Sequence, residues 1–269
     1  VLIIGTLTVV KQVEHAKDRP LGYDKDGTIM IEISSPEYYG KFNALRSELI
    51  RQNVILEMTQ SSSPLTDNWN SNDGFTWKGK EPEFSPYFNT VWITPEYGKT
   101  VGWEVTNGRD FSKDLTTDKS AYIINEAAAE YMGLQNPVGT IMHWFGGSEH
   151  EIIGVVKNML TESPFQSISP TIYIIDREEN NVNFFLIKLN PDKSVQRSLS
   201  SIENIMNKLI PGVPFEYQFT DQQHAKKFAA EQRVGKLSGI FAILAIFISC
   251  VGLFGMASFM TEKRTKEIG

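Results

Sequence analysis

The chain has 269 residues, a formal net charge of −6 and one cysteine, Cys250. The acidic balance and the lack of any run of lysine and arginine interleaved with aromatics argue against nucleic acid as a partner. A single cysteine excludes a disulfide within the chain. The four histidines are too scattered for the short spacing of a metal site.

The first ten residues, Val1–Val10, are apolar, and charge begins at Lys11. A helix that crosses a membrane needs about 20 such residues. No basic segment precedes this stretch and no small-residue cleavage site follows it, as a signal peptide would require. We therefore expect residues 1–10 to be the end of a first transmembrane helix whose start lies before Val1, and residues 11–27 to form a stalk.

Residues 28–64 predict a strand, a helix and a second strand. Isoleucines alternate with other residues in Thr28–Ser34, as in a half-buried strand. Ser35 followed by proline is a helix-start pattern. Asn53 is expected to end this helix, and Val54–Thr59 to form the second strand. Apolar residues recur at helical spacing between them: Tyr39, Phe42, Leu45 and Leu49.

Residues 65–165 predict an insertion with its own elements, including a helix around Asn125–Met132 and a strand around Ile152–Val156. Two histidine-containing pairs flank the glycine turn Phe145–Ser148, which predicts a hairpin tip rather than a metal site. The front of the insertion is rich in aromatics, which could form an exposed partner surface or the core of a small subdomain. These aromatics are Trp69, Phe75, Trp77, Tyr87, Phe88, Trp92 and Trp103.

A matching unit occupies residues 166–220. Thr171–Asp176 and Phe184–Leu189 predict strands, and Phe215–Phe219 alternates as a final strand. The helix between them is marked by Val195, Leu199, Ile202, Met206 and Leu209. We expect the two strand–helix–strand units to share one sheet, as a single α+β subdomain split by the insertion.

After this unit the pattern becomes helical and then wholly apolar. Residues 221–236 predict a stalk helix continuous with a second transmembrane helix over residues 237–261, which contains no charged residue. Basic residues follow the apolar segment, and lysine and arginine beside a span favour the cytoplasmic side. We therefore expect residues 262–269 to begin a cytoplasmic loop and residues 11–236 to be extracytoplasmic.

The chain lacks the motifs of common enzymes. It has no G-x-x-x-x-G-K-[ST] phosphate loop and no G-x-S-x-G nucleophile elbow. We expect no catalytic residue, no cofactor and no bound metal, and we expect any ATP hydrolysis to take place in a partner subunit or domain.

Several segments resemble a known family of permeases. GLFGMASF at Gly252–Phe259, followed by EKRTKEIG at Glu262–Gly269, resembles the start of the FtsX-like permease domain. Upstream segments, in the same order, resemble the MacB-type periplasmic domain: PLGYDKD at Pro20–Asp26, GRDF at Gly108–Phe111, INEAAAEYMG at Ile124–Gly133, NPVG at Asn136–Gly139 and IIGVV at Ile152–Val156.

The resemblance implies an α+β domain with a porter-like part and an inserted, sabre-like part, flanked by transmembrane helices. It implies a permease of an ABC transporter in the bacterial inner membrane, in contact with lipid, which forms a homodimer or pairs with another permease. It also implies a cytoplasmic ABC ATPase that drives export or mechanotransmission. A periplasmic adaptor or outer-membrane partner is left open, as is the transported substrate.

The resemblance also assigns expected roles to two groups of residues. The loop expected to contact the ATPase supplies coupling candidates: Glu262, Lys263, Arg264, Lys266 and Glu267. The periplasmic motifs supply residues for which turn formation or core packing is the favoured role: Gly108, Arg109, Asp110, Phe111, Asn125, Glu126, Asn136, Pro137, Gly139 and Gly154.

A membrane-anchored sensor would share this layout of two membrane helices. In such a protein the exterior domain binds a ligand and signals through its helices to a cytoplasmic output domain. The residues that follow Gly269 would separate the two, because a permease continues to further transmembrane helices and a sensor to a HAMP-like or coiled-coil segment.

Overall fold

The computed structural model describes residues 5, 11–16, 19–176 and 181–268, apart from the side chains of 230–232 and 262–268. The chain forms two compact units. One is Pro20–His224, and the other combines residues 1–19 with residues 225–269.

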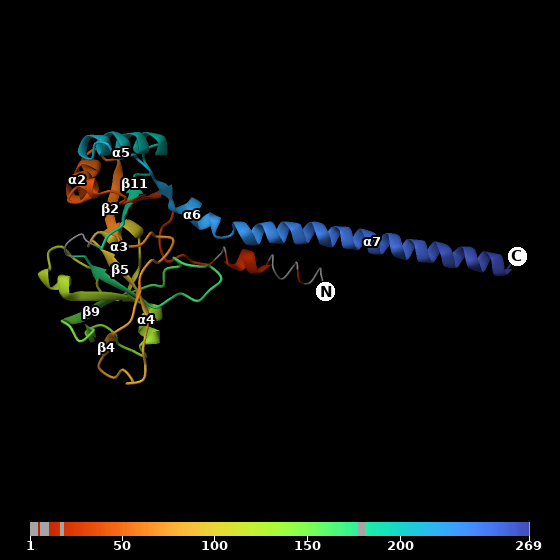
Figure 1. Ribbon diagram of the computed structural model, residues 1–269, viewed down its shortest axis with the longest axis horizontal. Helices are drawn as coiled ribbons and strands as arrows, with labels where there is room; N and C mark the ends of the chain where they lie inside the picture. The colour runs from red at the N-terminus through yellow and green to blue at the C-terminus, as the bar shows by residue number, and fades with distance from the viewer. Residues whose placement is uncertain (1–4, 6–10, 17–18, 177–180, 269) are drawn as a thin grey trace. The chain divides into compact units, whose positions relative to one another are not determined.

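Twelve strands form one mixed sheet within the described residues of Pro20–His224 (Figure 1). They are β1 (Thr28–Glu32), β2 (Ile55–Ser61), β3 (Ser71–Asn72), β4 (Phe75–Trp77), β5 (Phe88–Ile93), β6 (Val105–Gly108), β7 (Ala121–Asn125), β8 (Ile141–Trp144), β9 (Glu149–Val156), β10 (Thr171–Ile175), β11 (Phe184–Leu189) and β12 (Gln218–Phe219). Their order is β12-β1-β11-β2-β5-β10-β7-β9-β8-β4, with β3 beside β5 and β6 beside β9. The pairs β5–β10 and β7–β9 are parallel, and the others are antiparallel.

Helices connect these strands and continue beyond them. They are the 3₁₀ turns η1 (Pro36–Tyr38) and η2 (Thr116–Ser120) and the α-helices α2 (Phe42–Arg51), α3 (Tyr97–Val101), α4 (Glu126–Tyr131), α5 (Val195–Leu209), α6 (Thr220–Lys226) and α7 (Ala229–Ile268). Residues 11–16 are also helical. The mixed α+β fold expected from the sequence is confirmed.

The two predicted strand–helix–strand units do share one sheet. β11 pairs with β1, from Thr28↔Lys188 to Glu32↔Phe184, and on its other side with β2. β12 pairs with β1 through Ile29 and Met30. The limits of the insertion, after residue 64 and after residue 165, stay predictions, because the sheet runs through both parts without a break.

One strand of the second unit lies elsewhere. β10, predicted to belong with β1 and β2, pairs instead with β5 and β7, which are strands of the expected insertion. Its five residues are mostly buried, so their apolar composition predicts a strand without indicating its neighbours.

Three local expectations were wrong. The helix expected to start after Ser35 is divided into η1 and α2, and Gly40 lies between them with a φ of 69°. The final strand is limited to Gln218–Phe219. β1 is buried on both faces rather than one, because Ile29 and Ile31 pack against α2 and α5 while Met30 joins the opposite core.

Apolar side chains form a core on each side of the strands from β1 to β2. On one side, Phe185 is covered by two helices. These are α2, through Leu45 and Leu49, and α5, through Ile202 and Met206. Figure 1 shows α2 and α5 side by side over these strands. The other core extends along the sheet, since Met30 and Leu186 share it with Ile93, Ile123 and Tyr173. A third core packs α4 against β5, β7, β9 and β10.

Among the described residues, the shortest strand pairing in the sheet is the one between β2 and β5. In the described part of the chain these strands share one register pair, Ser61↔Ile93. Backbone bonds extend the junction, with Ser62 N–H donating to Trp92 O at 2.8 Å and Thr94 N–H donating to Gln60 O at 3.2 Å. The strands from β12 to β2 and those from β5 to β4 therefore form two halves of the sheet that meet at a short junction.

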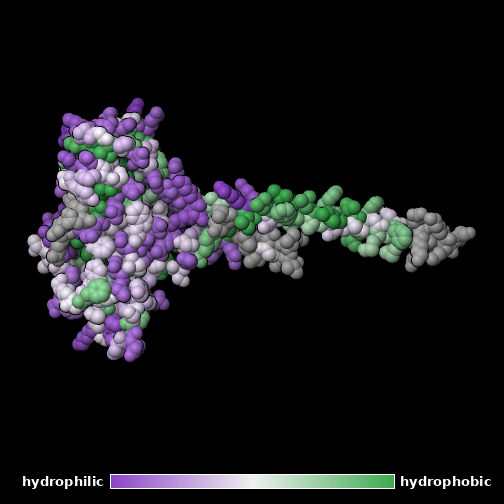
Figure 2. Space-filling view, viewed as in Figure 1, coloured by the Kyte–Doolittle hydropathy of each residue, from purple (hydrophilic) through white to green (hydrophobic). Residues whose placement is uncertain are grey.

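The second unit contains the long helix α7. Within the described residues, one helical segment, Arg233–Thr261, is long and apolar enough to cross a membrane. Large apolar side chains project from it into the surroundings, such as Phe254 at 75% and Ile243 at 69% exposed. Figure 2 shows the apolar surface that they form along the visible face of the helix. Val1–Val10, the expected end of a first span, lies outside the described residues apart from Gly5.

The expected continuous stalk is interrupted. α6 ends at Lys226, and α7 begins at Ala229 after a turn in which Phe228 N–H donates to Ala225 O at 3.2 Å. Phe228 is 2% exposed and packs with Val13 and Ala16. The helical residues 11–16 and the start of α7 are thus joined through an apolar contact in the same unit.

Truncation of Phe185 tests the core between β11 and the two helices. Phe185 is fully buried and contacts the rings of Tyr38 and Phe42. Phe185→Ala should lower the free energy of unfolding by about 3–5 kcal/mol. All five tryptophans lie between residues 69 and 144, so tryptophan fluorescence during denaturant unfolding of the chain in detergent reports this unit. Val195→Ala, at an exposed position of α5, should change little, and an equal effect of the two variants would contradict this core.

Candidate functional site

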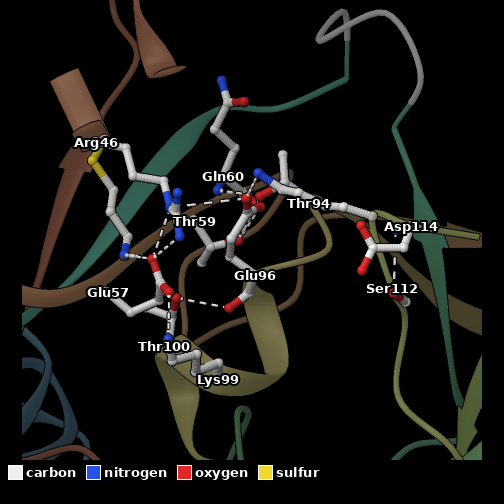
Figure 3. A network of polar contacts seen from close by, with 12 residues as sticks. Arg46, Glu57, Thr59, Gln60, Thr94, Glu96, Lys99, Thr100, Ser112 and Asp114 are labelled. Atoms are coloured by element: carbon white, nitrogen blue, oxygen red, sulfur yellow. Dashed lines mark hydrogen bonds and ion pairs between the residues drawn. The ribbon is translucent and has the colours of Figure 1, made fainter. Parts of the chain in front are cut away.

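A group of charged side chains lies at the junction between the two halves of the sheet (Figure 3). Glu57 of β2 is 2% exposed. Arg46 of α2 donates from Nε to Glu57 Oε1 at 2.7 Å, and Lys99 Nζ of α3 lies 3.1 Å from Oε2. The Met58 N–H also donates to Oε1, at 3.0 Å. Glu57 therefore joins α2, in the first half, to α3, which follows β5 in the second half.

A second buried carboxylate shares the same arginine. Glu96 immediately precedes α3 and is 6% exposed. It forms ion pairs with Lys113 and with Arg46, whose Nε lies 3.8 Å from Oε1. Among the described residues no regular hydrogen bond reaches either carboxylate oxygen of Glu96. Its charge is balanced by ion pairs alone. We refer to Arg46, Glu57, Glu96, Lys99 and Lys113 as the ion-pair joint.

Two threonine hydroxyls adjoin the ion-pair joint. Thr59 Oγ1 and Thr94 Oγ1 are 2.8 Å apart, and the Gln60 N–H donates to Thr94 Oγ1 at 3.1 Å. Both threonines are buried. These bonds reinforce the short pairing between β2 and the end of β5.

A pocket of about 380 Å³ opens beside Glu96. Its lining carries charges of both signs, including Lys113, Asp118 and Lys119. No histidine or cysteine is among the described residues that line it. The chemistry that this region offers is electrostatic and positional.

The GRDF motif forms a clamp next to the ion-pair joint. The Arg109 guanidinium donates to both oxygens of Asp118, at 2.7 and 2.6 Å, and the Ser112 N–H donates to Asp118 Oδ2 at 2.8 Å. Burial alone would raise the pKa of Asp118. The bonds from Arg109 and Ser112 and the arginine charge outweigh burial and hold that pKa below its usual value.

For Asp110, burial outweighs hydrogen bonding in its effect on the pKa. Its carboxylate accepts bonds from Trp103 Nε1 at 2.9 Å and from the Phe111 N–H at 2.7 Å. Burial raises the pKa of Asp110 more than these bonds lower it, and the nearby Asp118 charge raises it further. Phe111 is buried in the same core as Trp103.

Glycines allow the backbones of this motif and β9 to approach closely. A Cβ on Gly108 would lie 2.2 Å from Ile153 O, and Gly108 has a φ of 73°. A Cβ on Gly154 would lie 2.2 Å from Arg109 O. Both positions therefore require glycine, and Arg109 N–H donates to Ile153 O at 3.1 Å across this contact.

The remaining motif residues also have structural contacts. Asn125 accepts the Ala128 N–H as the N-cap of α4 and the Thr171 N–H of β10, both at 2.9 Å, and its amide donates to Ser169 O. Glu126 accepts the Asn158 N–H at 3.2 Å. Asn136 is exposed, Pro137 is buried, and Gly139 donates to Ile152 O at 2.8 Å.

Most of the aromatics singled out in the sequence are buried. Phe75, Trp77, Phe88 and Trp103 are each less than 10% exposed, and Trp92 is half-buried. Trp69 at 50% and Tyr87 at 59% are exposed, and Trp69 packs edge-on to Phe184. Of the two alternatives, core packing therefore describes most of these residues.

None of the five residues of the ion-pair joint was predicted from the sequence. One signal was available: Glu57 is the one charged residue of β2 (Ile55–Ser61), and a buried charge there requires a partner. The partners of Glu57 could not be found by spacing, because Arg46 and Lys99 lie 11 and 42 positions from it in the sequence.

The coupling candidates lie at the end of α7. The backbone of Glu262, Lys263, Arg264, Lys266 and Glu267 is helical, because α7 continues to Ile268. The side chains of these residues lie outside the described part of the structure. No contact is assigned to them.

Comparison with known proteins gives a family for the chain. The MacB-like periplasmic core domain family matches residues 1–205. The chain belongs to this family. A comparison with curated protein sequences gives no match.

The fold is shared with a solved structure. The periplasmic region of MacB from Actinobacillus actinomycetemcomitans matches with a TM-score of 0.54 and 15% identity, covering 79% of this chain and 97% of that one. The extracellular domain of the noncanonic ABC-type transporter YknZ from Gram-positive bacteria gives a TM-score of 0.48 and 18% identity, covering 71% and 98%. The domain is therefore a MacB-like periplasmic domain of the kind found in ABC transporter permease-type proteins.

A single and a double variant test the ion-pair joint of this MacB-like domain. Arg46→Met leaves Glu57 buried with only the exposed Lys99 as its cationic partner, and should lower the free energy of unfolding by about 3 kcal/mol. Arg46→Met combined with Glu57→Leu should recover more than half of that loss, because no unpaired charge remains buried. Both are measured by denaturant unfolding followed by tryptophan fluorescence.

A matched control is Arg51→Met on the same helix, since Arg51 pairs with Glu48 at the surface. It should leave the unfolding midpoint nearly unchanged. If the double variant were no more stable than Arg46→Met, the pairing energy assigned to the ion-pair joint would be wrong.

Acidification tests the clamp on Asp118. The pKa of Asp118 is lower in the folded chain, so its stabilising effect is complete above the unfolded pKa and is lost as the pH falls through the folded pKa. Asp118→Asn should lower the melting temperature at pH 7. It should also flatten the decline in melting temperature below about pH 5. Asp114→Asn, on an exposed neighbour, should keep the parent profile, and a parent-like profile for Asp118→Asn would exclude the clamp.

Proposed function

We propose that the chain is the extracytoplasmic domain and adjoining membrane segments of an ABC transporter permease that transmits an ATP-driven conformational change across the membrane. The observation that carries this proposal is a family match over residues 1–205 combined with α7, a helix able to span a membrane that follows the domain. ATP would be hydrolysed by a cytoplasmic ATPase, either fused or separate, because the chain has no phosphate loop.

The proposed orientation follows from the end of α7. Lys263, Arg264 and Lys266 come directly after the apolar segment, and cations beside a span favour the cytoplasmic, anionic leaflet. Residues 11–236 would then lie outside the bacterial inner membrane. The family is described as periplasmic, which supports the same orientation.

The domain offers a structural route for such motion. Its sheet has two halves joined by one register pair, two threonine hydroxyls, the ion-pair joint and a shared apolar core. Arg46 lies within ion-pair distance of both Glu57 and Glu96, so a change of angle between the halves would redistribute its charge between these two carboxylates. We infer that the two halves of the sheet change their relative angle during the transport cycle.

Other partners belong to the same proposal. A second permease copy, as a homodimer or a paired permease, would complete the transmembrane region. A periplasmic adaptor or outer-membrane protein would receive the motion of the domain.

Charge reversal at Glu267 tests the proposed contact with the ATPase. Arg264 and Glu267 are three positions apart on α7, so they share one face of the helix. Glu267→Lys in the full-length protein keeps the cytoplasmic excess of cations, so membrane insertion should survive. Stimulated ATPase activity in the reconstituted complex should fall roughly fivefold, as a lost coupling of about 1 kcal/mol predicts.

Glu203→Lys serves as the control, since Glu203 is an exposed residue of α5 in the exterior domain. It should leave stimulated ATPase activity unchanged. If Glu267→Lys changed neither complex assembly nor ATPase activity, residues 262–269 would serve only as a membrane anchor.

A further inference from the structure

A strap of irregular backbone, Leu21–Asp24, lies where the chain enters the larger of the two units. It falls inside the segment PLGYDKD. Backbone bonds fix both of its ends: the Leu160 N–H donates to Leu21 O, and the Asp24 N–H donates to Val101 O, each at 2.8 Å. Leu160 follows β9 and Val101 ends α3, so the strap is bound to two elements of the second half of the sheet.

The strap approaches its neighbours closely. Gly22 has a φ of 73°, and a Cβ added to it would lie 2.1 Å from Asn158 O. Only glycine therefore fits at this position. Tyr23 is 8% exposed and belongs to the core that also contains Met159, and Leu21 packs against the same core. Movement of the strap is thus passed to its neighbours rather than absorbed within it.

The helix α3 connects the strap to the ion-pair joint. A carbonyl in the last turn of a helix has no partner within that helix, and Val101 O of α3 accepts its bond from Asp24 of the strap. Glu96, just before α3, and Lys99, within it, belong to the ion-pair joint (Figure 3). With five residues, α3 is about 7.5 Å long. It is mostly buried and packs against β2 and β11, so its two ends move together.

The strap also reaches the first half of the sheet. Lys188 of β11 donates from Nζ to Asp24 Oδ2 at 2.5 Å and to Asp26 O at 2.6 Å. Shortly after the strap, the Leu189 N–H donates to Gly27 O at 2.8 Å. The strap and the residues that follow it therefore bridge the same two halves as the ion-pair joint.

We propose that the strap transmits movement of the entering chain to the ion-pair joint: a displacement of the strap shifts α3 and changes how Arg46 divides its charge between Glu57 and Glu96. Arg46 Nε is 3.8 Å from Glu96 Oε1, and the attraction between charges falls as their distance grows. A small shift of α3 therefore changes the attraction of Arg46 to Glu96. The use of this movement in transport rests on the function proposed above, whereas the connection itself does not.

Hydrogen exchange measured by mass spectrometry tests this connection in the full chain in an uncharged detergent. Gly22→Ala should push the strap away from Asn158 O. Peptides that cover α3 should then exchange about threefold faster or more, because α3 loses its bond from Asp24. Peptides that cover α4 should keep the parent rate, which separates this local effect from global unfolding.

Gly133→Ala is the matched control. Gly133 also has a positive φ, of 70°, but among the described residues nothing lies within 4 Å of an added Cβ. This variant adds the same kind of backbone strain without moving the strap, so exchange in α3 should stay at the parent rate. Equally fast exchange of α3 in both glycine variants would overturn the proposed connection.

The reverse experiment does not depend on the folding of the Gly22→Ala variant. Coupling between two sites is reciprocal, so Arg46→Met should speed the exchange of peptides that cover the strap by about threefold or more. Arg51→Met, which removes a surface pair of the same helix, should leave the strap at the parent rate.

A parent rate for the strap in Arg46→Met, or for α3 in Gly22→Ala, would exclude transmission through α3 and leave the strap as a local fastening. Neither measurement uses an ATPase. A failure of the proposed permease function would therefore be seen separately, in the Glu267→Lys experiment.

Discussion

The pairing of β11 with both β1 and β2 is the contact on which the rest of the domain depends. It joins residues near 30 and 58 to residues 184–189, so closing the chain around everything between them costs conformational entropy. Burial on both faces offsets that cost: Phe185 and Ile187 pack under α2 and α5, while Leu186 enters the core that continues toward β10. β5, β10 and β7 belong to a second half that meets the first at a short junction.

Two kinds of interaction hold the two halves of the sheet together. One contributes attraction, and the other fixes the geometry. The shared core that contains Met30, Ile93 and Tyr173 is apolar and contributes most of the attraction. The ion-pair joint adds less net stability, because desolvation of Glu57 and Glu96 opposes the Coulomb attraction. It fixes geometry instead: Arg46 can serve both carboxylates only when α2 and α3 keep one relative placement. A polar joint inside an apolar contact favours a small number of discrete arrangements over continuous sliding.

Sequence periodicity located β1, β2, β9, β10 and β11 and the helices α2, α4 and α5, but it did not predict β3 to β8 and did not show how the elements join. β11 and α5 match the predicted apolar patterns, because those patterns record burial of one element against its neighbours. The parallel pairing of β10 with β5 could not be predicted, since the register of distant strands leaves no local signature. The same holds for Glu57 and Arg46, whose pairing depends on the way α2 packs beside β2. Asn125 shows the intermediate case: its capping role is local and predictable, whereas its bond to Thr171 depends on the fold.

The break between α6 and α7 changes how motion of the membrane helix would reach the domain. A continuous helix would act as a rigid lever, and any tilt of α7 would be imposed directly on α6. The turn at Lys227 and Phe228 removes the helical hydrogen bonds that would enforce this. Phe228 instead packs with Val13 and Ala16, so the chain entering the domain and the chain leaving it are held together just where the helix is interrupted. If α7 spans a membrane, as we propose, the helical hydrogen bonding between it and α6 is interrupted at this turn, and the contact of Phe228 with Val13 and Ala16 lies at the interruption.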